Sequence, residues 1–269
     1  MVDYPATYVD MKRIETGDLD MNTIMITGCS SGFGLETARH FLDQGWSVVA
    51  TMRKPDAALL PASDRLRLVP LDVSDGNSIA HAVEAAGPID ALVNNAGVGW
   101  LCAFEATSEE TIRRIFETNT FGAFEMIRAV LPQMRAKGAG VIVNVSSSVT
   151  LKPLPLLSVY TASKAALNAC TECLALELAP LGIRTRLVLP GQAPATNFGA
   201  NARALMAGAD ETPAAYNPFV EQVMSDFRAN AAKELTRSED VVQAIWLAVT
   251  DPNCPLHLPA GSDAEALVA

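Results

Sequence analysis

Short apolar runs rich in β-branched residues alternate with helix-length segments along most of this chain. The apolar runs are residues 22–27, 46–51, 66–71, 89–94, 140–147 and 183–190. The segments with helical patterns are residues 32–44, 74–86, 108–137 and 159–179. Strands that are apolar on both faces and separated by helices form a parallel sheet that is covered on both sides. The alternation therefore predicts an α/β fold, a single-domain, doubly wound parallel sheet with helices on both faces.

The stretch TGCSSGFG, residues 27–34, follows the first apolar run and places three glycines in eight positions. A strand, a glycine-rich turn and a helix suit a phosphate, because the first N–H groups of a helix lack partners and carry partial positive charge. In a doubly wound sheet this turn lies at the edge where ligands bind. We expect it to hold the pyrophosphate of a dinucleotide, with contacts from Gly28, Ser30, Ser31, Gly32, Phe33 and Gly34.

The end of the second apolar run bears on the choice between NAD and NADP. About twenty residues beyond the turn, a site for NAD would offer Asp or Glu to the ribose hydroxyls, but this chain reads ATMRKP. Arg53 and Lys54 stand there, and together with Ser30 they would donate hydrogen bonds to a 2′-phosphate. One such bond, at about 1.5–3 kcal/mol, predicts a preference for NADP(H) of roughly tenfold to somewhat over a hundredfold. The alternative is that the two basic residues only solvate the strand end.

Tyr160 and Lys164, in YTASKAAL, stand four residues apart on a predicted helix, so they lie on one face, one turn apart. A phenol has a pKa near 10, and a fixed ammonium group beside it is expected to stabilise the phenolate and lower that pKa. Such a pair can move a proton. Ser147 ends the preceding strand, where its hydroxyl can hydrogen-bond a substrate carbonyl oxygen while the tyrosine protonates it.

Five short motifs occur in the order, and with the strand or helix placement, of one known family. They are TGCSSGFG, Asn94-Asn95-Ala96-Gly97, Asn119-Thr120-Phe121-Gly122, the serine run 146–148 and Tyr160-Thr161-Ala162-Ser163-Lys164. Together they resemble the classical short-chain dehydrogenases/reductases over about residues 22–260. The strand end VVATMR is similar to that of the hydroxysteroid-dehydrogenase-like and carbonyl-reductase members. The resemblance implies a Rossmann fold and hydride transfer between NADP(H) and a ketone or secondary alcohol.

The resemblance also implies roles for single residues. Tyr160 would be the general acid in reduction and the general base in oxidation, and Lys164 would also hold the nicotinamide ribose. Ser147, rather than Ser146 or Ser148, would be the active serine, because the family places it thirteen positions before the tyrosine. Asn119 would hold a water that links Lys164 to bulk solvent. The other implied cofactor contacts are Asp72 and Val73 at the adenine, Asn94, Ala96 and Gly97 along the cleft, and Pro190, Gly191 and Thr196 at the nicotinamide.

Several alternatives stay open. Thr196 stands six positions after Pro190, whereas the family commonly has a threonine at five. Asn94 and Asn95 could instead tie neighbouring strands together. The chain could be an NAD-dependent alcohol or hydroxysteroid dehydrogenase, or a non-catalytic protein that senses dinucleotides, although a mere binder has no need of the full catalytic set. Nucleotide-sugar dehydratases and epimerases share YxxxK but usually carry TGxxGxxG, and the spacing TGxxxGxG disfavours them.

The substrate is less well defined by the sequence than the cofactor. Apolar residues near the expected catalytic positions suggest a hydrophobic carbonyl compound, such as an aryl ketone or a steroid-like ring system. The same residues could instead be core or subunit contacts. They are Trp100, Leu101, Phe104, Leu151, Pro153, Leu154 and Leu156, together with an irregular segment over 191–232 that we expect to act as a substrate loop or lid.

Composition limits the partners and the location of the protein. The 269-residue chain has a net charge of -10 and no run rich in Lys and Arg, so we expect neither nucleic acid nor a membrane as a partner. Residues 1–20 show no signal-peptide pattern and are expected to be a loosely ordered extension before a catalytic domain at 21–269, whose first strand begins at Met21. A cytoplasmic location follows as an expectation. By the resemblance, the partners are a small ketone or alcohol and further copies of the chain, as a homodimer or homotetramer.

The cysteines and histidines predict no metal site. Five scattered cysteines fit reduced thiols better than a disulfide framework. Cys170 and Cys173 form a CxxC inside a helical segment, with neither a second pair nor a nearby histidine, so we expect buried helical thiols. His40, His81 and His257 lie far apart and show no ligand spacing.

Overall fold

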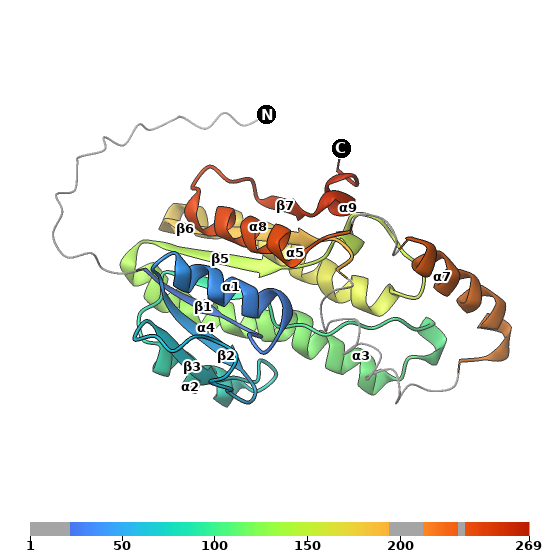
Figure 1. Ribbon diagram of the computed structural model, residues 1–269, viewed down its shortest axis with the longest axis horizontal. Helices are drawn as coiled ribbons and strands as arrows, with labels where there is room; N and C mark the ends of the chain where they lie inside the picture. The colour runs from blue at the N-terminus through green and yellow to red at the C-terminus, as the bar shows by residue number, and fades with distance from the viewer. Residues whose placement is uncertain (1–21, 194–211, 231–234, 269) are drawn as a thin grey trace.

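The computed structural model describes residues 22–193, 212–230 and 235–268 of the chain. The predicted extension 1–20, Met21, Thr196 and parts of the predicted substrate segment lie outside the described residues. Figure 1 shows a central sheet with helices on both sides and α7 extending away from it. The predicted fold class is confirmed: this is a doubly wound α/β architecture of the Rossmann type.

The sheet has seven strands, paired in parallel in the order β3-β2-β1-β4-β5-β6-β7. Six of them occupy the predicted apolar runs. The seventh follows the last long helix and was not identified from the sequence, because it is short and contains a histidine and a proline. The strands are β1 (Thr23–Ile26), β2 (Ser47–Met52), β3 (Leu66–Pro70), β4 (Ala91–Asn94), β5 (Gly140–Val145), β6 (Ile183–Pro190) and β7 (His257–Ala260).

Helices cover both faces of the sheet because successive side chains of each strand point to opposite sides. In β1, Ile24 and Ile26 pack on one face, whereas Met25 packs on the other. The first face is covered by α1 (Gly32–Asp43) and α8 (Ser238–Thr250). The second face is covered by α2 (Gly76–Ala86), α4 (Gly122–Lys137) and α5 (Ser158–Leu178).

The predicted helical region 108–137 is not one regular helix. It contains α3 (Glu109–Phe116), a π-helical turn (Glu117–Phe121) and α4. Within that turn the Asn119 side chain accepts a hydrogen bond from the N–H of Val98 and donates one to its carbonyl oxygen. Wide turns of this kind inside α-helices are common at functional sites.

The predicted irregular character of residues 191–232 is wrong for its second part. Residues Asn217–Asn230 form α7, preceded by a short 3₁₀ turn at Ala214–Tyr216. Pro218 lies in the first turn of this helix, where its missing N–H costs no intrahelical bond.

The prediction for the CxxC pair is also wrong in part. Cys173 is exposed and Cys170 is partly exposed, because the face of α5 that packs inward carries Tyr160, Lys164 and Leu167 instead. All five cysteines are free thiols. The contacts of Cys170 and Cys173 indicate no structural role for the pair.

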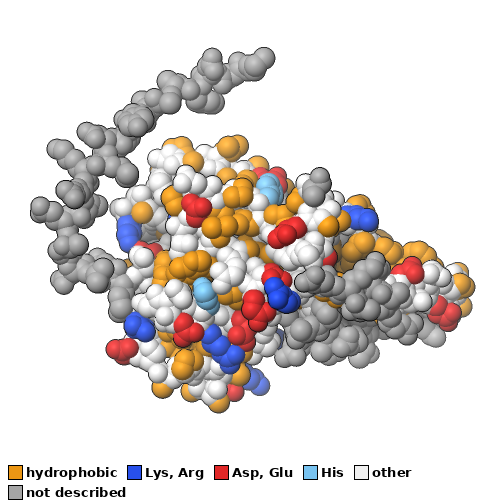
Figure 2. All heavy atoms as spheres, turned by 45° about the horizontal axis from the view of Figure 1, so that its top comes forward, with side chains coloured by type: hydrophobic (Ala, Val, Ile, Leu, Met, Phe, Trp, Pro, Cys, Tyr) orange, Lys and Arg blue, Asp and Glu red, His pale blue; other side chains and the backbone are white. Residues whose placement is uncertain are grey.

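The surface shows no segregation of charge on the face seen in Figure 2, where acidic and basic side chains lie intermixed. Apolar side chains gather at the end of the molecule that carries α7, where Phe219 and Met224 are exposed. Within the described ranges, no helix has both the length and the apolar character needed to cross a membrane. The same ranges contain no cluster of His, Cys, Asp or Glu suited to a metal ion.

Candidate active site

The site lies where the order of the strands reverses, between β1 and β4. In doubly wound sheets, ligands bind at the carboxyl ends of the strands beside this reversal. Thr27, just after β1, accepts hydrogen bonds at its hydroxyl from the N–H groups of Asn95 and Ala96, both at 3.0 Å. The Asn95 amide in turn donates to the carbonyl oxygens of Thr27 at 2.9 Å and Gly28 at 3.2 Å. Hydrogen bonds therefore join the glycine-rich turn to the Asn94-Asn95-Ala96-Gly97 motif.

Gly28 is required at this junction for two reasons. Its φ of +78° lies in the left-handed region that favours glycine, and a Cβ atom there would stand only 2.9 Å from Cα of Ala96. Gly34 is crowded as well, because its Cβ would lie 2.5 Å from the carbonyl oxygen of Gly28. The turn, the first helix and the end of β4 therefore pack backbone against backbone, as expected for Gly28 and Gly34.

The start of α1 suits an anion. The side chain of its N-cap residue, Ser31, makes no capping hydrogen bond, and the first turn holds no acidic residue. The helix is three turns long, so its first N–H groups carry partial positive charge that a phosphate would neutralise. Ser30 is exposed and Gly32 half-buried beside it. These features fit the pyrophosphate predicted for the turn.

The structure brings Arg53 close to Asp72. Arg53 and Lys54 are exposed just beyond β2, and Asp72 follows the neighbouring strand β3. Hydrogen bonds from the hydroxyl and N–H of Ser74, at 2.6 and 3.0 Å, lower the pKa of Asp72, and the Arg53 charge lowers it further. Arg53, predicted to contact a 2′-phosphate, and Asp72, predicted to contact the adenine, therefore lie at one corner of the sheet.

Val73 lies beside this corner and packs against the start of α4. A Cβ atom on Gly122 would stand 2.7 Å from the Val73 carbonyl oxygen, so the two backbones are in close contact.

The predicted catalytic residues converge on a buried spot at the end of β5. Ser147 follows that strand, and Tyr160 and Lys164 lie one turn apart on α5. The side chains of Ser147 and Tyr160 are hydrogen-bonded. All three residues are buried. A proton-donating phenol, a hydroxyl and an amine thus meet where water has little access.

Asn119 and Lys164 approach each other across Gly97. A Cβ atom on Gly97 would lie 3.3 Å from Oδ1 of Asn119 and 3.4 Å from Nζ of Lys164. The Lys164 ammonium donates to the carbonyl oxygen of Val145 at 2.8 Å. Asn119 donates to Val98 at 2.9 Å and to Ser163 at 3.1 Å, and accepts from the Val98 N–H at 2.8 Å. The π-helical turn therefore fixes Asn119 beside the lysine.

The direction expected for the pKa of Tyr160 is wrong. Burial raises the pKa of the phenol to about 12, and the hydrogen bond with Ser147 only partly opposes this. Burial likewise lowers the pKa of Lys164 to about 8. The lysine charge alone would lower the pKa of the phenol, but burial disfavours the charged form of both groups. At neutral pH the phenol is protonated and is thus poised to donate.

Asn94 makes the contacts expected if it ties strands together. Its amide donates to Oδ1 of Asn144 on β5 at 2.9 Å and to the carbonyl oxygen of Ala123 at 3.4 Å. Asn144 donates in turn to Thr171 on α5 at 2.8 Å. The side chain is buried, so this geometry favours a structural role over the predicted contact with a cofactor.

Gly191, after β6, is held by a residue that the sequence did not reveal. The Asp263 carboxylate accepts the Gln192 N–H at 2.7 Å and the Thr236 hydroxyl at 2.6 Å. The Gly191 N–H also bonds the carbonyl oxygen of Ala260 at 3.2 Å. Pro190 and Gly191 thus sit against the end of β7 and α9 (Ser262–Glu265). No sequence signal pointed to Asp263, because its partners are remote along the chain.

Of the residues predicted to line an apolar pocket, some lie in the core and others on the surface. Trp100 is only 2% exposed, and its indole N–H donates to Thr107 at 3.0 Å, so it belongs to the core. Phe104 is 65% exposed, and Leu151 and Leu154 are exposed as well. Leu156 has a φ of +63°, an uncommon conformation for a side chain of its size.

The remaining predicted wall residues are less informative. Leu101 is half-buried and Pro153 is exposed.

The 3₁₀ turn that precedes α7 is attached to the cluster that contains Trp100 and Tyr160. The Tyr216 hydroxyl is hydrogen-bonded to Glu105 at 2.9 Å, and its ring packs on the cluster that contains Trp100 and Tyr160. This contact raises the pKa of Tyr216.

Comparison with known proteins agrees with this geometry. The family model described as short chain dehydrogenase matches residues 22–206. An uncharacterised oxidoreductase of Bacillus subtilis, YusZ, is 37% identical over 250 residues, which cover 88% of each chain. Human retinol dehydrogenase 8 is 36% identical over 251 residues, which are 87% of this chain and 80% of the human one.

A solved structure extends the comparison to a bound cofactor. The short chain dehydrogenase from Burkholderia cenocepacia, solved in complex with NADP, matches with a TM-score of 0.73 and 26% identity. The match covers 92% of this chain and 91% of the other.

Proposed function

The chain belongs to the short chain dehydrogenases, and from this premise we propose that it is an NADPH-dependent ketoreductase acting on hydrophobic carbonyl compounds. Membership makes it an oxidoreductase that uses a nicotinamide dinucleotide. The observation that carries the proposal is the burial of Ser147, Tyr160 and Lys164 together at the end of β5, with the lysine beside Gly97.

The protein's own part in the reaction is to place the substrate and move one proton. When bound, the reduced cofactor supplies the hydride to the carbonyl carbon. Tyr160 donates its phenolic proton to the carbonyl oxygen as negative charge develops there, and Ser147 donates a hydrogen bond to the same oxygen. Lys164 and Asn119 form the route by which Tyr160 regains a proton, because they lie together beside Gly97.

With its pKa raised, the phenol of Tyr160 is protonated at neutral pH, which is the form that carbonyl reduction needs. A phenol with a pKa of about 12 holds its proton, as an acid catalyst requires. To act as a base in alcohol oxidation, it would first have to lose that proton. We therefore expect oxidation to need a higher pH than reduction.

The preference for NADPH is supported by Arg53. Its charge lies near Asp72 at the corner of β2 and β3, where the ribose of the adenosine half would lie in this fold. Among the solved structures that match at 25% identity or more, the dehydrogenase from Burkholderia cenocepacia and a serine dehydrogenase contain NADP, whereas the 3-ketoacyl reductase from Brucella melitensis contains NADH. Ser31, Phe33 and Lys54 are proposed as further cofactor contacts, with Ala96 and Gly97 along the cleft.

A hydrophobic substrate is supported by exposed apolar side chains in the segments that follow β4 and β5 and in α7. Phe104, Leu154 and Phe219 offer apolar surface that water solvates poorly. One relative is named for retinol, a largely apolar alcohol. These residues would bind the apolar body of a ketone whose carbonyl group enters toward Tyr160.

We also infer that the protein forms a homodimer or homotetramer. Phe121, at the start of α4, and Leu176, on α5, are exposed and apolar. Burial of such side chains against a second copy would remove apolar surface from water.

The test is oxidation of NADPH and of NADH, followed by absorbance, over a panel of aliphatic, aryl and cyclic ketones. We expect NADPH to be preferred by at least about tenfold, and Tyr160→Phe to reduce kcat by roughly 10²–10⁴-fold with unchanged binding of NADPH. Arg53→Ser should remove most of the preference, whereas Arg67→Ser, an exposed arginine on β3, should leave it intact.

Each alternative has its own outcome. Preference for NADH in the wild type would identify an NAD-dependent dehydrogenase and would overturn the role of Arg53. Tight binding of NADPH without turnover on any ketone or alcohol, in the wild type as in Tyr160→Phe, would favour a dinucleotide sensor.

A further inference from the structure

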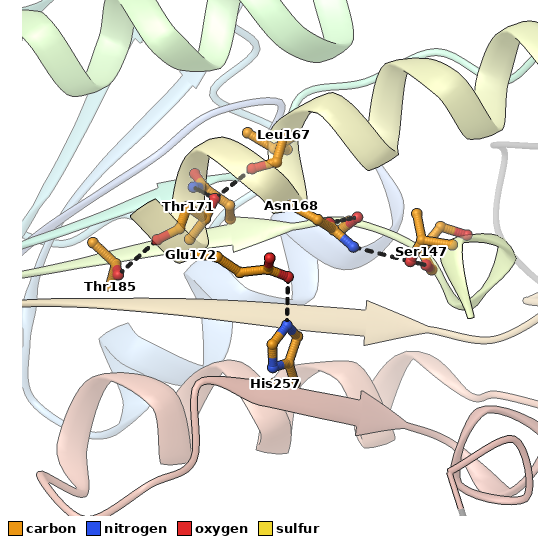
Figure 3. A network of polar contacts seen from close by, with 10 residues as sticks. Ser147, Leu167, Asn168, Thr171, Glu172, Thr185 and His257 are labelled. Atoms are coloured by element: carbon orange, nitrogen blue, oxygen red, sulfur yellow. Dashed lines mark hydrogen bonds and ion pairs between the residues drawn. The ribbon is translucent and has the colours of Figure 1, made fainter. Parts of the chain in front are cut away.

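The turn that carries Ser147 is held by a residue of another element. Figure 3 shows Asn168, on α5, pointing at the segment that follows β5. Its Oδ1 accepts the Ser146 hydroxyl at 2.5 Å, and its amide donates to Oγ1 of Thr150 at 3.0 Å. Asn168 therefore forms hydrogen bonds with the turn on both sides of Ser147.

These hydrogen bonds continue to the backbone of Ser147. The Thr150 hydroxyl that receives the Asn168 amide donates to the carbonyl oxygen of Ser147 at 2.8 Å. The N–H of Thr150 bonds the same oxygen at 3.2 Å, and the N–H of Val149 bonds Oγ of Ser147 at 3.4 Å. The chain of contacts runs from the amide of Asn168 through Thr150 to the residue that meets Tyr160.

An asparagine suits this place because it presents an acceptor and a donor together. Its carbonyl oxygen meets one hydroxyl and its NH₂ group meets another, and a side chain with one kind of group could not satisfy both partners in this arrangement. Asn168 follows Lys164 by four residues, as Lys164 follows Tyr160, so all three lie along one side of α5.

We propose that Asn168 is a positioning residue, which fixes Ser147 relative to Tyr160 by tying the Ser146–Thr150 turn to the helix that carries the tyrosine. It touches neither substrate nor cofactor. This proposal rests on the proposed function for its kinetic consequence, but the structural tie itself does not. A shift of about 1 Å in a catalytic group can reduce rate by roughly a hundredfold, so a locked turn has catalytic value.

The kinetic test is a double-mutant cycle with Asn168→Leu and Ser147→Ala. Asn168→Leu should lower kcat by about tenfold while KM for NADPH changes less than about twofold. In the Ser147→Ala background the same substitution should have almost no further effect, because the residue that it positions is gone. Ser146→Ala removes only one of the two ties and serves as the milder variant if Asn168→Leu folds poorly; it should lower kcat by a smaller factor in the same direction.

The matched control is Glu172→Gln, one turn further along the helix. Glu172 forms an exposed ion pair with His257 at 2.9 Å (Figure 3) and has no link to the turn. It should leave kcat unchanged. Equal losses from Asn168→Leu in both backgrounds, or no loss in either, would overturn the proposal.

A second measurement does not depend on turnover. Amide hydrogen exchange of Val149, Thr150 and Leu151, followed by NMR, should accelerate in Asn168→Leu and stay unchanged in Glu172→Gln. If the wild type reduces no ketone, the proposed function fails alone and this exchange experiment still decides the structural tie. Unchanged exchange in Asn168→Leu would show that the turn does not depend on Asn168.

Discussion

Two sides of the site are built differently. The proposed cofactor side, formed by residues 27–34 and 94–97, is joined by hydrogen bonds that Asn95 and Ala96 donate to Thr27, and Gly28 and Gly34 have no room for a side chain. The substrate side, formed by residues 100–106, 147–157 and 213–226, exposes large apolar side chains and includes Leu156 at positive φ. The first side is closely packed without a ligand, whereas the second exposes apolar surface.

The largest effect should come from Gly28→Ala on the cofactor side. Positive φ and the close approach to Ala96 together predict a loss of about 2–4 kcal/mol in the free energy of unfolding, and weaker binding of NADPH. Gly45→Ala is the matched control, because Gly45 has a φ of +86° but nothing within 4 Å of its Cβ position. It should lose only about 1 kcal/mol. Urea unfolding of both variants measures the difference, and equal losses would mean that crowding at Gly28 is not important.

Lys164 lies where the two sides meet, and its replacement should stabilise the protein. Burial lowers its pKa from 10.5 to about 8, so the charged form is disfavoured in the folded state. At pH 7, Lys164→Met should gain about 2 kcal/mol: roughly 3 from removing this penalty, less about 1 for the lost bond to Val145.

The stability difference between the wild type and Lys164→Met should also depend on pH. Between about pH 8 and 10.5 the unfolded wild type binds more protons at this lysine than the folded protein does, so wild-type stability rises relative to the variant. The gain of Lys164→Met should therefore shrink across that window. If the gain stays constant with pH, burial does not destabilise the charged form of Lys164 in the folded protein.

The smallest effect should come from Phe104→Ala on the substrate side. The ring is 65% exposed, so only its contact with a bound apolar ketone is lost, and KM should rise by roughly fivefold, or about 1 kcal/mol. Leu247→Ala, at a 42% exposed position on α8, should leave KM unchanged. If KM rises equally in both variants, or in neither, Phe104 lies outside the path of the substrate.

The same contrast explains what the sequence could predict. Gly28, Tyr160 and Lys164 follow from local spacing, because a turn between a strand and a helix and a one-turn separation on a helix are set within a few residues. The apolar runs predict six of the seven strands for the same reason.

Other features depend on contacts between remote parts of the chain. The pKa of Tyr160 depends on burial by several elements, and Asp263 meets Gln192 only after the whole sheet has formed. Trp100 reads as a pocket residue in the sequence and is core, since its indole finds a partner in Thr107. Spacing along the chain carries no information on such pairs.

The carboxylate of Asp263 has a consequence for how such a protein can change. It bonds Gln192 and Thr236 together, so the chain between them leaves and re-enters the fold at one point. Doubling the length of a flexible loop whose ends are already joined costs only about 0.6 kcal/mol. An insertion between these two residues should therefore cost the sheet little stability, because both ends of the stretch stay bonded to Asp263.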